Sequence, residues 1–365
     1  MKFKNTIVRL ATLLKFDRGF MKNIGSSRLL ELDALRGFAV TSVVLFHITM
    51  RSEVTRYGLK FGVTGVDLFF IISGFVILLT LEKNNHWKDF VVSRFSRLYP
   101  TYWICVTITA VLSIVVNILQ NKSSQGLGLQ YLVNMTMFQS YFRVPDLDGS
   151  YWTMAEEMSF YLFMLLVSLT KQLKKIEIIG CIALTLTVFY HLLLNTKYHF
   201  LHEVISTYIP IVNHYPLFLS GIIFYNIKFG KPKFYRYLGV ALCFGIQYNL
   251  FFDGGHSKFF ISQREYGFML MLYFAIFLLY VNNHLYFIVN KISLFLGKIS
   301  YSLYLIHYLL GVSIVTVLTK YCHLNIWISS LLITLPIILV VATLINKYIE
   351  NPSMHYIRSK YKQQL

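Results

Sequence analysis

Apolar residues gather along this chain in ten long segments that are separated by shorter polar stretches. Because an α-helix needs roughly 20 predominantly apolar residues to cross a bilayer, segments of this length are typical of membrane-spanning helices. The pattern therefore predicts an all-α, polytopic membrane helix bundle with about ten transmembrane helices. Their expected bounds are 33–50, 61–81, 98–119, 151–170, 176–194, 205–227, 235–252, 265–282, 299–319 and 325–347.

The ten spans leave no stretch for a second globular domain. Residues 1–30 combine basic and apolar residues at helical spacing, and we expect them to form an amphipathic segment at the membrane interface. Residues 31–352 would form the integral-membrane domain, and 353–365 a basic cytoplasmic tail. The longest connection, 120–150, is polar at first and then apolar, so its second half is expected near the interface.

The composition, with 56% hydrophobic and 14% charged residues, also indicates a membrane protein. A net charge of +18 raises the question of a nucleic-acid partner, but the charge follows the predicted topology. If the N-terminus is cytoplasmic, 24 of the 34 Lys and Arg residues lie on the cytoplasmic side and 9 on the outer side. Because cytoplasmic loops of membrane proteins carry such an excess, we expect both termini in the cytoplasm, contact with membrane lipid and no nucleic acid.

The first span, LDALRGFAVTSVVLFH, contains Arg36 and His47. An ionisable group in a bilayer costs about 2.5 kcal/mol or more, so such residues tend to face a bundle interior or a water-filled path. Eleven positions at 3.6 residues per turn place the two side chains on one helix face, about 16 Å apart along the axis. Arg36 would lie near the cytoplasmic end and His47 near the outer end. A simpler interpretation of Arg36, a side chain that reaches out to the headgroups, stays open.

Two acidic residues are embedded at a similar depth. Asp67 in GVDLFFIISGF and Glu157 in WTMAEEMSFY each lie about two turns into their spans from the outer side, level with His47. Three titratable groups at one level are a candidate acid–base centre, because imidazole exchanges protons near neutral pH and a carboxylate can orient its ring. Glu156 is the alternative to its neighbour Glu157, and Asp67 could instead pair structurally with a basic residue.

The cytoplasmic side carries a different signal. Arg94 and Arg97 in RFSRLYPTYW are three residues apart just before the third span, and neighbouring guanidiniums suit phosphate groups. Charges that set the topology near anionic lipid would give the same pattern. In the ninth span, SYSLYLIHY places His307 a little over two turns above the cytoplasmic face, closer in depth to Arg36 than to His47.

Together these motifs resemble the integral-membrane acyltransferase 3 family, whose bacterial members modify lipopolysaccharide O-antigen, capsule, exopolysaccharide and related glycans. The resemblance runs from Leu32 to about Pro352, with seven motifs in the family's order. They are LDALRG with a histidine ten residues after the arginine, GVDLFFIISGFVI, RFSRLYPTYW, WTMAEEMSFYL, PLFLSGIIFY, SYSLYLIH and YIENPS. One departure is Trp-Thr-Met before the glutamates, where the family usually has Trp-Ser-Leu.

The resemblance implies transfer of an acyl group, usually acetyl, from cytoplasmic acyl-CoA to a hydroxyl of a glycan beyond the bacterial inner membrane. With the residue pattern, it assigns catalysis to His47, Glu157 and Asp67, donor binding to Arg36, Arg94, Arg97, Tyr304 and His307, and acceptor contacts to Tyr151 and Trp152. Aromatic residues of an interfacial belt would look like the last two. Acyl-CoA would be a co-substrate; no permanently bound cofactor and no metal are expected, and the oligomeric state stays open.

A second class of function stays open, because a bundle with buried charges could also move a solute or a lipid-linked saccharide across the membrane. A transporter or flippase would use the level of His47, Asp67 and Glu157 for coupling. It would have little use for two arginines at the cytoplasmic surface, and we find no convincing inverted repeat in the sequence. The pattern therefore favours the acyltransferase.

Overall fold

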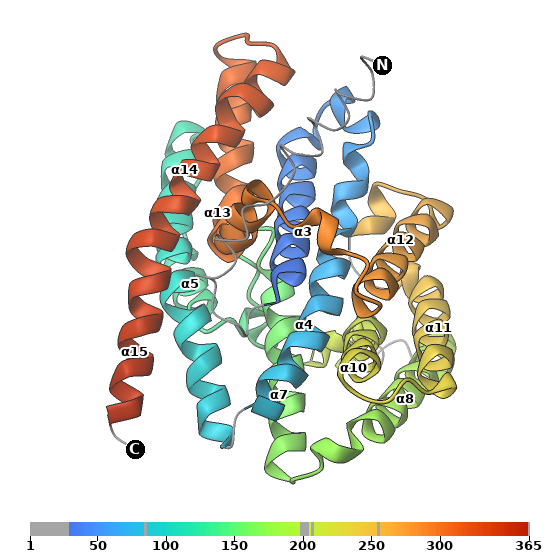
Figure 1. The fold of residues 1–365 in the computed structure, drawn as a ribbon. Coiled ribbons are helices and arrows are strands. Elements are labelled where there is room, and N and C mark those ends of the chain that lie inside the picture. The colour runs from blue at the N-terminus through green and yellow to red at the C-terminus, as the bar shows by residue number, and fades with distance from the viewer. Residues whose placement is uncertain (1–28, 84–85, 198–203, 206–207, 254–255, 364–365) are drawn as a thin grey trace, which may run out of the picture.

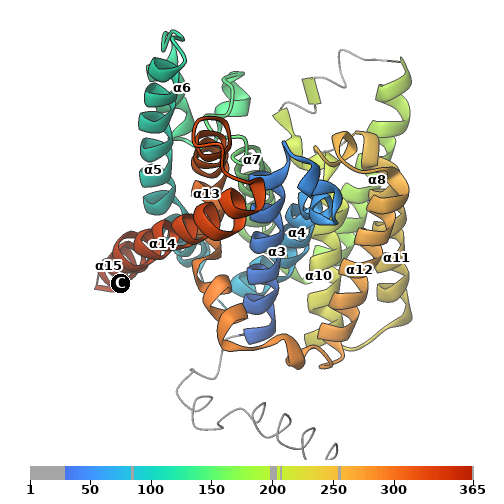
Figure 2. The same cartoon turned by 90° about the horizontal axis from the view of Figure 1, so that it is seen from above.

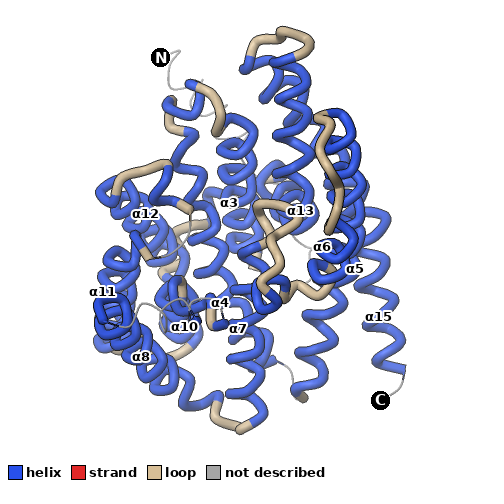
Figure 3. Tube along the Cα trace, turned by 180° about the vertical axis from the view of Figure 1, so that it is seen from behind, coloured by secondary structure: helices blue, strands red, loops and turns tan. Residues whose placement is uncertain are grey.

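The computed structural model describes residues 29–83, 86–197, 204–205, 208–253 and 256–363. The predicted interfacial segment lies outside this part of the chain except for its last two residues. Across the described residues the chain forms helices joined by loops and contains no strand (Figure 1; Figure 3). The predicted all-α class is therefore confirmed.

Each predicted span corresponds to a helical region of the described chain. The first nine are α3 (Leu30–Thr49), α4 (Gly65–Lys83), α5 (Trp87–Leu119), α7 (Trp152–Leu169), α8 (Ile176–Lys197), α10 (Tyr215–Phe229), α11 (Phe234–Asn249), α12 (Gln263–Val281) and α13 (Lys291–Lys320). The last is continuous through a π-helix (Ile328–Thr334), α14 (Leu335–Ile345), a second π-helix (Asn346–Glu350) and α15 (Asn351–Gln363). The short helix α6 (Leu127–Asn134) lies in the longest connection.

Seven helices in the described part are long and apolar enough to cross a membrane. The helices α7, α10 and α11 do not reach that length and hydropathy. The structure thus supports a multi-pass helix bundle, and the count of ten spans stays a prediction.

The helices that carry the embedded polar residues lie in the middle of the bundle. Seen from above, α3, α4, α7 and α13 are central, with α5, α14 and α15 on one side and α8, α10, α11 and α12 on the other (Figure 2). The side chains of Arg36, His47, Asp67, Glu157 and His307 therefore project from central helices.

The crossing of α3 and α13 depends on two glycines. A Cβ atom at Gly37 would lie 2.6 Å from the carbonyl oxygen of Ser293, and one at Gly297 would lie 2.0 Å from that of Asp33. Neither distance is sterically possible, so the backbones approach as closely as they do because both positions lack a side chain. Such small-residue contacts are a common way of packing helices in membranes.

Two helices begin earlier than the apolar pattern predicts. Helix α13 begins at Lys291, eight residues before the predicted start at 299, because the Asn290 side chain accepts hydrogen bonds from the N–H groups of Ile292 and Ser293 while the Ser293 hydroxyl accepts from the Asn290 N–H. Helix α5 begins at Trp87 and continues through Pro100, which the predicted start at 98 had placed in the first turn. Polar first turns are invisible to a hydropathy pattern, which explains both errors.

Candidate active site

A cavity of about 70 Å³ lies at the centre of the bundle, between α3, α4, α5, α7 and α13. Its apolar lining comes mostly from α4, which contributes residues such as Phe69, Ile72 and Val76. Its polar lining consists of Arg36, Ser73, Arg94, Arg97, Thr153, Glu157, Tyr161, Ser300, Tyr301 and Tyr304. Five of the predicted site residues, Arg36, Arg94, Arg97, Glu157 and Tyr304, therefore share one cavity.

The cavity has an excess of positive charge. Three guanidiniums, from Arg36, Arg94 and Arg97, face it with one carboxylate, and Arg36 lies within electrostatic reach of the other two. Asp33 offsets part of the charge of Arg36, with 3.3 Å between Nη1 and Oδ1. The Nε atom of Arg94 is buried and has no hydrogen-bond partner in the described structure. Because buried N–H groups are rarely left unpaired, the cavity is suited to an anionic ligand.

Glu157 is held at the wall of this cavity by two hydroxyl groups. Its Oε1 atom accepts hydrogen bonds from Ser73 Oγ at 3.1 Å and from the Tyr161 hydroxyl. The carboxylate also lies within electrostatic reach of Arg94. Since Arg94 and Arg97 are three residues apart within the helical part of α5, both point to the same wall.

His47 lies in a second polar group, next to the cavity, with a partner that the sequence did not predict. Its Nδ1 atom is 2.9 Å from Nε2 of His307 on α13. The predicted depth of His307, closer to Arg36 than to His47, is therefore wrong. The error has the same origin as the start of α13, because His307 is sixteen residues from Lys291 and so lies much deeper along the helix than a start at 299 implies.

The hydrogen bonds of the pair define its tautomers. His307 Nδ1 donates to the Tyr304 carbonyl oxygen, which can only accept, at 2.6 Å. In a neutral His307 ring Nε2 then carries the lone pair and accepts from His47 Nδ1–H. His47 Nε2 is left with a free lone pair. His307 therefore orients His47 in the way that a carboxylate orients the histidine of a hydrolase triad.

The surroundings of His47 differ on its two sides. The ring packs edge-to-face against Tyr308, with centroids 4.9 Å apart. Arg36 and the cavity lie three turns away along α3, on the same helix face. Beyond the other end of α3 is a polar groove of about 590 Å³, lined by Met50, Arg51, Ser52, Glu53, Thr55, Arg56, Lys60 and Phe260. His47 is thus placed between a cationic cavity and an open polar groove.

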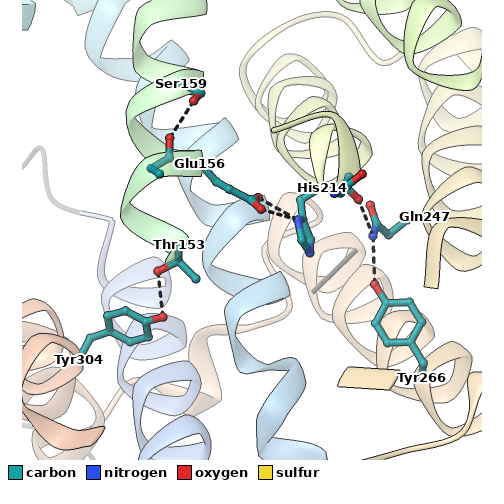
Figure 4. Close-up of polar contacts among 9 residues, drawn as sticks. Thr153, Glu156, Ser159, His214, Gln247, Tyr266 and Tyr304 are labelled. Atoms are coloured by element: carbon teal, nitrogen blue, oxygen red, sulfur yellow. Dashed lines mark hydrogen bonds and ion pairs between the residues drawn. The ribbon is translucent and has the colours of Figure 1, made fainter. Parts of the chain in front are cut away.

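Glu156 and Asp67 belong to a third polar group, away from both. The carboxylate of Glu156 pairs with Nδ1 of His214 at 2.8 Å, and Figure 4 shows it pointing from α7 towards that ring. Asp67 is buried within electrostatic reach of Glu156 and His214, and it hydrogen-bonds Tyr266. Tyr266 continues this network through Gln247 (Figure 4).

The structure does not bring the three predicted catalytic residues together. Adjacent residues on a helix project about 100° apart, so Glu156 faces His214 while Glu157 faces the arginine cavity. Asp67 is turned from α4 towards α12. Depth along the membrane normal, which the sequence predicts, says nothing about the rotation of each helix, and rotation separates these groups from His47.

The two aromatic residues predicted on the acceptor side occupy buried positions. Tyr151 is fully buried, and its hydroxyl contacts Thr109 and the Leu305 carbonyl oxygen. Trp152 packs edge-to-face on His256 and lies beside His214. Tyr151 is therefore removed from any surface that a glycan could contact.

A further arginine near the cavity was missed from the sequence. On α15, Arg358 donates to Ser96 Oγ at 3.1 Å and lies within electrostatic reach of Arg94 and Arg97. In the sequence it is one of several basic residues in a segment that we interpreted as a tail. Its helical spacing with Tyr361 and Ile357, continuing α14, was the signal that could have joined it to the bundle.

The long apolar helices with a polar centre define a multi-pass membrane protein. Comparison with known families makes this more specific, because the model of the acyltransferase 3 family, described as an acyltransferase domain, matches residues 29–347. The chain therefore belongs to this acyltransferase family, as its motifs predicted.

Individual relatives match over shorter stretches. Peptidoglycan O-acetyltransferase OatA of Listeria monocytogenes is 31% identical over 148 residues, which are 36% of this chain and 23% of OatA. A Bacillus subtilis protein named "Putative peptidoglycan O-acetyltransferase YrhL" is 29% identical over 147 residues, 36% of this chain and 22% of the relative. The match thus spans less than a third of each of these relatives. No solved structure matches the chain.

Proposed function

We propose that this protein is a membrane O-acetyltransferase that moves an acetyl group from acetyl-CoA to a hydroxyl of a cell-envelope glycan. The observation that carries the proposal is the arrangement along α3: a cationic cavity at Arg36, a histidine with a free lone pair at His47, and an open groove beyond it. A transfer between a phosphorylated donor and a carbohydrate acceptor needs these three parts in this order.

The donor would enter at the arginines. Coenzyme A carries several phosphates, which guanidiniums bind through paired, charge-assisted hydrogen bonds. The three arginines and the unpartnered Arg94 Nε support this assignment. The cavity has apolar walls from α4 and reaches Tyr304, whose carbonyl oxygen bonds His307. An extended pantetheine arm would follow that direction and bring the thioester to His47.

His47 would act through Nε2. In direct transfer, Nε2 takes the proton of the acceptor hydroxyl while its oxygen attacks the thioester carbonyl carbon; the C–S bond breaks and the coenzyme leaves as a thiol after protonation. In a two-step route, Nε2 itself attacks that carbon and the acetyl-imidazole then acylates the hydroxyl. Both routes require the tautomer that His307 selects, because both use the lone pair on Nε2.

The acceptor would occupy the groove lined by Arg51, Ser52, Glu53 and Lys60, among others. Charged and hydroxyl side chains of this kind hydrogen-bond sugar hydroxyls. OatA and YrhL carry peptidoglycan in their names, which supports an envelope glycan as the acceptor. The groove and the cavity lie at opposite ends of α3, so donor and acceptor would approach from opposite membrane faces, with acetyl-CoA on the cytoplasmic side of the plasma membrane.

A reconstituted reaction tests the proposal. The purified protein in lipid nanodiscs would be given acetyl-CoA labelled in the acetyl group, with and without solubilised cell-wall glycan strands. We expect label in the glycan and release of coenzyme A thiol only when both substrates are present, and neither product with His47→Ala. Transfer at the wild-type rate by a folded His47→Ala protein would refute the proposal.

A further inference from the structure

The loop that precedes α7 lies against α13 beside the histidine pair (Figure 3). Its last four residues, Asp-Gly-Ser-Tyr at positions 148–151, are here called the 148–151 loop. All four contact α13 between positions 304 and 309. The loop therefore covers the stretch of α13 that carries His307, although neither of its polar ends touches the histidine directly.

Asp148 and Tyr151 bond the backbone of α13 on either side of His307. Asp148 Oδ2 accepts from the Leu309 N–H at 3.0 Å, and the Tyr151 hydroxyl donates to the Leu305 carbonyl oxygen at 3.3 Å. In a regular α-helix these two backbone groups are each other's partners, since N–H of residue i bonds the carbonyl of residue i−4. The loop thus supplies partners to both ends of the backbone turn that spans His307.

Ser150 adds a contact to the residue that fixes the tautomer of His307. The Tyr304 hydroxyl donates to the Ser150 carbonyl oxygen at 3.1 Å. The carbonyl oxygen of the same tyrosine accepts the hydrogen bond from His307 Nδ1 at 2.6 Å. Because the loop holds Tyr304 at its side chain, it also limits how that carbonyl can move relative to the imidazole.

Gly149 makes room for the ring that packs on His47. A Cβ atom at this position would lie 2.8 Å from two ring carbons of Tyr308, Cε1 and Cζ. The other side of the Tyr308 ring is in edge-to-face contact with His47. A side chain at position 149 would therefore push Tyr308 towards His47 or away from its place beside it.

We propose that the 148–151 loop is the positioning element of the His47–His307 pair, with Asp148 and Tyr151 fixing the α13 backbone around His307 and Gly149 allowing Tyr308 to support His47. This inference rests on the proposed function, since it gives the loop a role in the acetyl-transfer step. The four loop residues act through α13 and do not contact the acetyl group.

The charge of Asp148 is part of this role. Burial raises the pKa of Asp148 to about 6, so the side chain is ionised at pH 8. The carboxylate then accepts from three donors, the Leu309 N–H, the Ser150 N–H at 2.9 Å and the Ser150 hydroxyl at 2.7 Å. An asparagine has only one acceptor oxygen and would turn its NH₂ group towards one of these donors.

Asp146 offers a matched control two residues away in the same loop. Its carboxylate accepts from Gln139 Nε2 at 2.7 Å, within the segment between α6 and α7. The contacts of positions 148–151 with α13 do not involve it. Asp146→Asn therefore changes the same chemical group without touching the helix that carries His307.

The test compares Asp148→Asn, Tyr151→Phe and Asp146→Asn in the reconstituted acetyl-transfer assay at pH 8. Misplacing a catalytic group by a fraction of an ångström costs rate, so we expect kcat to fall about tenfold in the first two variants. The KM for acetyl-CoA should stay within about twofold, because the loop does not line the arginine cavity. Asp146→Asn should match the wild type in both.

A double-mutant cycle with His307→Ala separates positioning from general loss of structure. If the loop acts through His307, adding Asp148→Asn to His307→Ala costs little further rate. Wild-type kcat in both Asp148→Asn and Tyr151→Phe, or a full tenfold additional loss on the His307→Ala background, would overturn the inference. The proposed function fails separately, through wild-type transfer by His47→Ala, so the two failures are distinguishable.

Discussion

Nε2 of His307 lies 2.9 Å from Nδ1 of His47, although 260 positions separate the two residues along the chain. The contact depends on the close crossing of α3 and α13 and on the early start of α13 at Lys291. It leaves the lone pair of His47 on Nε2, where it can accept a proton or attack a carbonyl carbon. The predictions below follow from this pair and from the arginine cavity beside it.

Replacing His307 should slow the reaction without abolishing it. His307→Ala removes the acceptor for His47 Nδ1–H and frees the ring to adopt the other tautomer. Orienting and general-base effects contribute about 100-fold or more, so we expect a loss of that size in kcat and a larger one in His47→Ala. His284→Ala, on an exposed loop, serves as the control and should be neutral. Equal rates for His307→Ala and the wild type would show that the pair is not functional.

The arginines should govern donor affinity. Arg94→Ala and Arg97→Ala each remove a guanidinium from the cavity, and we expect the KM for acetyl-CoA to rise about tenfold while kcat changes little. Lysine at either position keeps the charge but loses the planar pair of donors, so it should restore only part of the affinity. Arg264→Ala, at an exposed position on α12, is the control. Unaltered KM in the Arg94→Ala Arg97→Ala double variant would remove coenzyme A from this cavity.

The two adjacent glutamates should give opposite phenotypes. Glu157→Gln changes the charge of the cavity, where Ser73 and Tyr161 hold the carboxylate, and should lower activity with little effect on stability. Glu156→Gln breaks the buried ion pair with His214 and should lower stability by about 2 kcal/mol. Thermal unfolding in detergent and acetyl transfer, measured on the same samples, would reveal this. Reversed phenotypes would exchange the roles of the two residues.

The crossing of α3 and α13 should tolerate no added methyl group. Gly297→Ala would place Cβ 2.0 Å from the Asp33 carbonyl oxygen, and overpacking of this kind costs about 1–3 kcal/mol. Because the helices must separate, acetyl transfer should fall as well. Gly245→Ala on α11 is a matched control, since nothing lies within 4 Å of its Cβ position. Alanine there should be neutral or stabilise by about 0.5–1 kcal/mol. The close crossing would be contradicted by a Gly297→Ala variant as stable as Gly245→Ala.

The sequence predicted the parts of this protein that depend on hydropathy and local spacing. The helical class follows from the apolar segments, and the three-residue spacing of Arg94 and Arg97 correctly indicated a shared cationic site with Arg36. Family membership also followed from motifs, because their order along the chain is a local property.

What the sequence missed depends on helix ends and helix rotation. The Asn290 cap shifted the start of α13 and with it the depth of His307, which an apolar pattern cannot detect. The separation of His47 from Asp67 and Glu157 arises because each side chain leaves its helix in a different direction. Likewise, nothing in Asp148 itself indicates a bond to the Leu309 N–H, since that contact joins positions 161 residues apart.

The most direct test of the central claim is the acetylation of envelope glycans in living cells. Mass spectrometry would compare cells with the intact gene, with the gene deleted, and with the deletion complemented by His47→Ala or by the control His284→Ala. The account predicts that the added mass of one acetyl group per modified sugar disappears on deletion, returns with His284→Ala and stays absent with His47→Ala at equal protein levels. Unchanged acetylation in the deletion strain, with an altered amount of exported glycan, would contradict it and favour a transporter.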